Sequence, residues 1–96
     1  MNIVEYFVRL NLRRKIAALH DSVHDIEERL AELDSLLDTW ETKVLANGRQ
    51  PSDIIEKIAN WRAERAKLRV RTPKLARDIV KLETELKMEY SKQRSV

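Results

Sequence analysis

Apolar residues recur along the first half of the chain at alternating steps of four and three residues, and no step is missed between Leu12 and Val44. Such a heptad pattern is typical of a helix that packs along one stripe in a coiled coil, with apolar residues at its a and d positions. The stripe consists of Leu12, Ile16, Leu19, Val23, Ile26, Leu30, Leu33, Leu37, Trp40 and Val44. We therefore predict one long helix over about residues 3–46.

A polar segment at residues 47–52 ends this pattern. It contains Gly48, the only glycine in the chain, and Pro51. Glycine is favoured just past the end of a helix, and proline cannot continue one. We therefore predict that a short turn over this segment joins the first helix to a second one.

The stripe resumes after the turn and predicts a second helix over about residues 53–92. Its positions are Ile54, Ile58, Trp61, Arg65, Leu68, Thr72, Leu75, Ile79, Leu82 and Leu86. Pro73 leaves the heptad phase unshifted, which favours a continuous helix with a kink near Pro73. The alternative is a third helix that starts there, with Thr72 as its N-cap and Pro73 at its first helical position.

Two helices of nearly equal length joined by a short turn predict an all-α fold, a long antiparallel, coiled-coil-like helical hairpin that forms a single domain over residues 1–96. The shortest register compatible with the turn places opposite each other stripe residues whose numbers add to 98, such as Leu37 and Trp61. We interpret Arg65 and Thr72, the two polar stripe residues, as residues that disfavour other registers. Three pairs of opposite charge flank the stripe and fit the same register: Arg13 with Glu83, Glu27 with Arg69, and Asp34 with Arg62.

The N-terminal segment departs from the stripe. Ile3, Phe7 and Leu10 follow one another at i, i+4 and i+7 on a different face of the predicted helix, and Tyr90 lies at the same open end of the hairpin. The alternation of apolar residues within residues 3–10 would also fit a β-strand. Because the hairpin leaves this end uncovered, these four residues are our candidates for binding a partner protein.

A second outward stripe of mostly small apolar residues follows the second helix. It comprises Ile55, Ala59, Ala63, Ala66, Val70, Ala76 and Val80. A two-helix hairpin covers only one stripe on each helix, so this face needs a further partner. We therefore predict a homodimer in which two hairpins form a four-helix bundle.

The distribution of charge suggests an alternative function. The net charge is +3, and residues 62–77 hold seven basic side chains against Glu64 alone. An arginine-rich helix of this kind can bind the phosphate groups of RNA or DNA. No aromatic side chains are interleaved with these residues for base stacking, which makes nucleic-acid binding the second hypothesis and not the first. Four of the basic residues would project away from the hairpin: Lys67, Arg71, Lys74 and Arg77.

The remaining candidate chemistry is sparse. The chain has no cysteine, so disulfides and thiol catalysis are excluded. His20 and His24 have the i, i+4 spacing of a zinc site, but no third ligand accompanies them, and we expect neither a metal nor a cofactor. A two-helix hairpin offers no concave pocket that excludes water, so we predict that the protein is not an enzyme. No apolar run approaches the roughly 18 residues that cross a bilayer, and we expect a cytoplasmic protein without a membrane partner.

Together these patterns predict a non-enzymatic protein–protein interaction module that acts through a helical hairpin. Adaptor, inhibitor, assembly chaperone and structural subunit fit the sequence equally well. Its candidate docking residues are Ile3, Phe7, Leu10 and Tyr90. A small helical bundle that binds RNA or DNA through the basic face of the second helix is the alternative.

Overall fold

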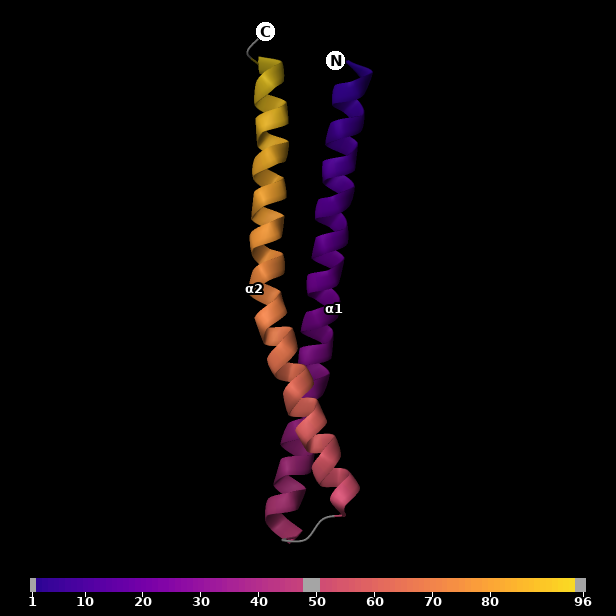
Figure 1. Cartoon of the computed structure of the whole chain (residues 1–96), viewed down its shortest axis with the longest axis vertical. Coiled ribbons are helices and arrows are strands. Elements are labelled where there is room, and N and C mark those ends of the chain that lie inside the picture. The colour runs from indigo at the N-terminus through magenta and orange to yellow at the C-terminus, as the bar shows by residue number, and fades with distance from the viewer. Residues whose placement is uncertain (1, 48–50, 95–96) are drawn as a thin grey trace. The chain divides into compact units, whose positions relative to one another are not determined.

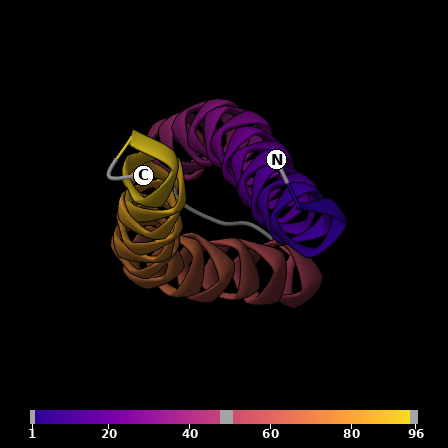
Figure 2. The same cartoon turned by 90° about the horizontal axis from the view of Figure 1, so that it is seen from above.

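The computed structural model describes residues 2–47 and 51–94 of the chain, which form two long helices (Figure 1). Helix α1 spans Ile3–Asn47, and helix α2 spans Ser52–Arg94. Each helix is continuous over these bounds and is drawn as a coiled ribbon in Figures 1 and 2. Both helices lie close to the bounds that the heptad pattern predicts, and the all-α helical hairpin is confirmed.

The N-terminal segment is helical, and the described residues contain no strand, so the strand alternative for residues 3–10 is wrong. Asn2 explains why α1 begins where it does. Its side-chain Oδ1 accepts a hydrogen bond from the backbone N–H of Val4 at 2.9 Å, and its carbonyl accepts one from Tyr6 at 3.1 Å. Asparagine is a preferred N-cap because its oxygen satisfies an N–H that has no partner within the helix. Residues 48–50 of the predicted turn lie outside the described residues.

Helix α2 continues through Pro73, so the alternative of a third helix that starts there is wrong. Proline has no N–H with which to donate to the carbonyl of Arg69, four residues earlier, and one helical hydrogen bond is lost. The hydroxyl of Thr72 donates to the carbonyl of Leu68 at 2.9 Å, the bond that a threonine inside a helix makes, whereas an N-cap would accept from later N–H groups. The unshifted heptad phase was the sequence feature that predicted this continuity.

The packing of the chain divides it into two compact units. The terminal unit comprises Met1–His24 and Pro73–Val96, and the central unit comprises Asp25–Thr72. In the terminal unit, Arg9 of α1 contacts Glu89 of α2. In the central unit, Glu41 and Asp34 of α1 contact Arg62 and Arg65 of α2, so the two helices run antiparallel in each unit. Each unit is therefore an antiparallel pair of helical segments.

The twenty stripe residues, which we call the seam, are all buried or half-buried, as the heptad pattern predicts. Two of them, Leu33 and Leu37 of the central unit, are at most 1% exposed and are the most deeply buried side chains. Both tryptophans are half-buried. Because charged residues surround the seam on each helix, no helix has an apolar stretch, within the described residues, that is long enough to cross a membrane.

The ion pairs that flank the seam in the central unit differ from the predicted ones. The sequence predicts that Asp34 pairs with Arg62. The guanidinium groups near Asp34 instead belong to Arg65, a seam residue, and to Arg69, which flanks the seam. Each flank residue lies between two partners that are seven residues apart on the other helix, and long side chains can reach either one. Arg62 and Arg69 therefore each pair with an acid one heptad away from the predicted partner. The observed pairs are Arg62–Glu41 at 2.8 Å, Arg65–Asp34 at 3.2 Å and Arg69–Asp34 at 3.7 Å.

The terminal unit differs in the same way. Glu83 was predicted to pair with Arg13, but its Oε1 lies 3.6 Å from Nε2 of His20. The guanidinium of Arg13 instead lies over the ring of Tyr90, with 5.5 Å between its Cζ atom and the ring centroid. A guanidinium is attracted to the negative face of an aromatic ring, so Tyr90 provides a competing partner that the charge pattern alone does not reveal.

Candidate functional site

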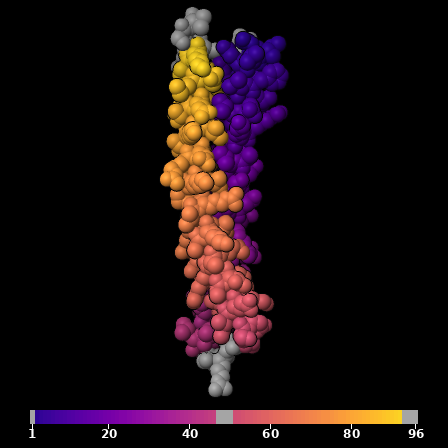
Figure 3. All heavy atoms as spheres, viewed as in Figure 1, coloured from indigo at the N-terminus to yellow at the C-terminus, as the bar shows by residue number. Residues whose placement is uncertain are grey.

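Exposed apolar side chains cluster on the first two turns of α1. We call this cluster the N-terminal patch; it comprises Ile3, Val4, Tyr6, Phe7 and Val8. Ile3 is 72% exposed and Phe7 is 60% exposed. The rings of Tyr6 and Phe7 touch edge to face, with 5.7 Å between their centroids, so part of the patch is held in place before any partner binds. The space-filling view shows these first residues of α1, in indigo, at the surface (Figure 3).

The four predicted docking residues do not form one surface. Ile3 and Phe7 belong to the N-terminal patch, whereas Leu10 and Tyr90 are half-buried. Leu10 and Tyr90 instead line a small cleft of the terminal unit, together with Tyr6, Arg9 and Arg13. The exposed part of the candidate surface therefore lies toward the N-terminus, and Leu10 and Tyr90 line the neighbouring cleft.

Arg9 belongs to the candidate site but is not among the residues that the sequence predicts for it. Its side chain is buried at 5% exposure, its Nη2 donates to the carbonyl of Glu89 at 3.3 Å, and its Cζ lies 4.6 Å from the centroid of Tyr90. Arg9 lies seven residues before Ile16 and Glu89 lies seven residues after Leu82, so both continue the seam. Their numbers add to 98, as the predicted register requires. The heptad phase predicts both seam positions, but the prediction considered only apolar residues at such positions.

The first turns of α1 consequently have inverted polarity. Glu5 and Arg9 occupy seam positions and are half-buried and buried, while the apolar residues of the N-terminal patch face outward. Helices of soluble proteins normally turn their apolar face to the core and their charged face to water. Contiguous exposed apolar surface commonly marks the place where another molecule binds. This end of α1 therefore has the arrangement expected of a docking surface.

The cleft below the patch holds two positive charges beside each other. The guanidinium groups of Arg9 and Arg13 both lie over the ring of Tyr90. Arg13 is exposed, and Glu89, the acidic residue beside this ring, is half-buried and bound to Lys92 at 3.0 Å. Like charges at close range favour the approach of an anionic group, which would reduce their repulsion.

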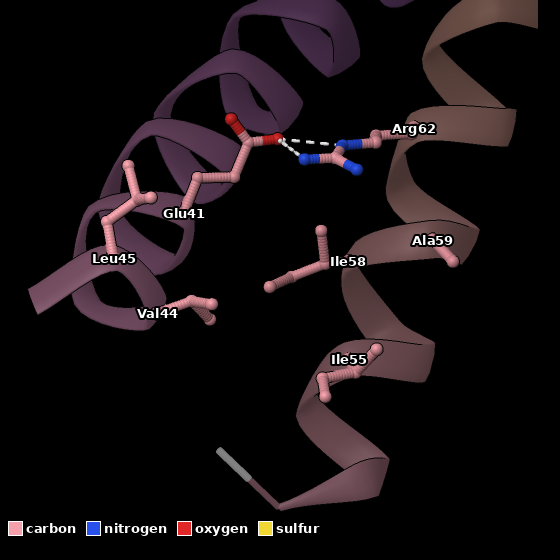
Figure 4. A pocket seen from close by; sticks show the side chains of 7 residues that line it. All are labelled: Glu41, Val44, Leu45, Ile55, Ile58, Ala59 and Arg62. Carbon is pink, nitrogen blue, oxygen red and sulfur yellow. Dashed lines mark hydrogen bonds and ion pairs between the residues drawn. The ribbon is translucent and has the colours of Figure 1, made fainter. Parts of the chain in front are cut away.

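The central unit contains a second apolar hollow between α1 and α2. Val44, Leu45, Ile55, Ile58 and Ala59 line it, and an ion pair between Glu41 and Arg62 bounds one end (Figure 4). The hollow has a volume of about 310 Å³, and Leu45 at its edge is 86% exposed. In Figure 4 the carboxylate of Glu41 points across to Arg62, and Ile58 lies between the two helices. The hollow therefore offers mainly apolar contact, with one ion pair at its end.

Arg29 connects the two helices of the central unit by a bidentate ion pair. Its Nε and Nη2 atoms donate to the two carboxylate oxygens of Glu64, the second at 3.0 Å, and its Nη1 lies 2.8 Å from Glu32. The hydrogen bonds from Arg29 lower the pKa of Glu64 below its ordinary value, and those from Glu64 raise the pKa of Arg29. Both groups therefore stay charged at neutral pH, and their role is to join the helices.

The other candidate residues lie on the surface. His20 and His24 are exposed, and no cluster of three or more potential metal ligands occurs among residues 2–47 and 51–94. The four residues of the nucleic-acid alternative are also exposed. Two of them belong to the central unit and two to the terminal unit: Lys67 and Arg71, and Lys74 and Arg77.

Comparison of the chain with protein-family models, with curated proteins and with solved structures finds no match in any of the three. The functional argument therefore rests on the geometry of the N-terminal patch and of the residues around it.

Proposed function

We propose that the protein is a non-enzymatic interaction module that binds a partner protein through the N-terminal patch. The observation that carries this proposal is the inverted polarity of α1, in which Glu5 and Arg9 occupy the seam while Ile3 and Phe7 lie exposed. An adaptor, an inhibitor, an assembly chaperone or a structural subunit would use such a surface in the same way. We expect the docking to take place in the cytoplasm and without a membrane, in keeping with a chain that lacks cysteine.

The patch can supply the energy that specific binding needs. Full burial of a large apolar side chain contributes roughly 1.5–3 kcal/mol, and a few such residues commonly dominate the energy of an interface. Phe7 and Ile3 each have more than half of their surface available for burial. The contact between Tyr6 and Phe7 reduces the conformational entropy that binding would otherwise cost.

The double substitution Ile3→Ser/Phe7→Ser is expected to abolish partner capture. Both side chains are exposed in the free protein, so helicity and thermal stability should change little. The measurement is affinity capture from the native host, quantified by mass spectrometry, for wild-type protein and variant side by side. Leu45→Ser/Met88→Ser is the matched control, because these side chains are 86% and 61% exposed and lie outside both the patch and the outward apolar stripe of α2.

Retention of the same partner by the patch variant would show that docking occurs elsewhere. Nucleic-acid binding through Lys67, Arg71, Lys74 and Arg77 is the alternative proposal, and their exposure supports it. Nuclease treatment of the lysate distinguishes the two functions, since a partner that is held through the patch stays bound after the treatment.

We also propose that the protein forms a homodimer, in which two hairpins pack as a four-helix bundle. The support is the outward face of α2 in the central unit, where small side chains would let a second helix approach closely. This face comprises Ile55, Ala59, Ala63, Ala66 and Val70, all of them exposed in the single chain. Such a face remains solvated unless another chain covers it.

Sedimentation equilibrium is expected to give twice the chain mass of 11.3 kDa at micromolar concentration. Ala66→Glu should shift the species toward the monomer, because it places an unpaired charge in the proposed contact. Lys67→Glu is the matched control, since it adds the same acid one residue away on an exposed position outside the small-residue face. A wild-type protein that sediments as a monomer at these concentrations would contradict the dimer.

A further inference from the structure

Two rows of side chains at the start of α1 each run from an apolar residue to a basic one. Ile3, Phe7, Leu10 and Arg14 follow one another at i, i+4, i+7 and i+11, so the helix aligns them along one side. A neighbouring row aligns Val4, Val8, Asn11 and Lys15 in the same way. Any helix that lies along the N-terminal patch and continues toward the C-terminus of α1 will therefore meet these cations.

Along residues 3–15 of α1 the exposed charges are of one sign. Arg13, Arg14 and Lys15, which we call the basic triplet, are all exposed. Between residues 3 and 15 the only acid is Glu5, which is half-buried at a seam position and does not belong to the outward rows. Asp78 and Glu85 of α2 line a hollow together with Lys15, so an acidic partner gains most from contact with Arg13 and Arg14.

This distribution decides between the possible occupants of the patch. A second copy of the same face would bring two basic triplets together, and their repulsion disfavours that arrangement. A nucleic acid would satisfy the cations but not Ile3 and Phe7. A helix with an apolar face and acidic flanks satisfies both, because its side chains recur with the same spacing as the rows of α1.

We propose that the partner docks through an amphipathic helix whose apolar face covers the N-terminal patch and whose Asp or Glu residues contact the basic triplet; this inference rests on the proposed function. The cleft between Tyr6, Arg9, Leu10, Arg13 and Tyr90 receives one of these carboxylates. Arg13 is the residue of this cleft that can turn to the ligand, because its guanidinium lies over Tyr90 while its side chain is exposed.

Two synthetic peptides test the inference with the full chain. Both are amphipathic helices with leucine on one face; one carries glutamate on its flanks and the other carries lysine at the same positions. Fluorescence anisotropy at low salt is expected to show the glutamate peptide binding about tenfold tighter than the lysine peptide. Arg14→Glu/Lys15→Glu should reverse this preference, and Lys74→Glu/Arg77→Glu, which makes the same charge change elsewhere, should preserve it.

The outcomes separate the inference from the proposed function. Equal binding of both peptides, lost in Ile3→Ser/Phe7→Ser, would overturn the acidic partner but leave apolar docking intact. Failure of both peptides to bind the wild-type protein would overturn the inference, while partner capture would still decide the proposed function. Binding to vesicles of phosphatidylcholine with phosphatidylserine, dependent on the basic triplet and without binding of the glutamate peptide, would assign the surface to lipid and also overturn it.

Discussion

Leu33→Ala is expected to lower the free energy of unfolding by about 2–5 kcal/mol, the range for truncation of a fully buried leucine. Leu33 has no exposed surface, and its loss would remove apolar contacts and leave a cavity in the seam of the central unit. A chain of this size has a total stability of only about 5–15 kcal/mol, so the substitution should remove a large share of it. Urea unfolding followed by circular dichroism, at one fixed protein concentration, measures the change.

Leu45→Ala is the matched control for this prediction. It makes the same chemical change on the same helix, but Leu45 is 86% exposed, so the free energy of unfolding should change by no more than about 0.5 kcal/mol. Equal destabilisation by the two substitutions would show that the seam at Leu33 is not the core of the central unit.

Two substitutions of Arg9 are expected to have opposite effects. Arg9→Ala should lower the free energy of unfolding by about 1–3 kcal/mol, because it removes the packing of a buried side chain and its contact with Tyr90. Arg9→Met keeps most of that volume, can contact the ring through its sulfur, and removes a charge that is costly to bury. Its free energy of unfolding should equal that of the wild-type protein or exceed it.

Thermal and urea unfolding of the two Arg9 variants decide what the charge contributes. If Arg9→Met is as unstable as Arg9→Ala, the guanidinium itself stabilises the fold, through Tyr90 and the carbonyl of Glu89. If Arg9→Met is the more stable variant, the arginine is retained at a cost in stability. A polar residue at a seam position commonly serves to fix the register of paired helices, and Arg9 would then have this role.

Helix positions and the buried face could be predicted because they depend on local periodicity. The unbroken steps from Leu12 to Val44 identify both a helix and the side that it buries, and the structure buries or half-buries all of those residues. The unshifted phase at Pro73 was likewise sufficient to predict a continuous α2. These features require only the geometry of a helix and the preference of apolar groups for the core.

The candidate site could be predicted only in part. The stripe of Ile3 and Phe7 was visible in the sequence, but the guanidinium groups of Arg9 and Arg13 that pack on the ring of Tyr90 were not, nor was the cleft that Leu10 lines with them. Apolar periodicity does not register such contacts, because the residues that make them are charged. The heptad phase, followed through polar positions as well, would have placed Arg9 opposite Glu89.

The sequence by itself determined that this protein is two long helices that share one seam, since the heptad phase of each helix fixes which residues face inward. Only the tertiary structure decided which flanking charges meet, with Arg62 on Glu41 and Asp34 between Arg65 and Arg69. The structure also shows that the charged residues Glu5 and Arg9 occupy the seam at the start of α1, while the apolar side chains of the N-terminal patch face outward. The physical reason is that long side chains can reach partners in neighbouring heptads, so packing selects among pairings that the residue spacing leaves equivalent.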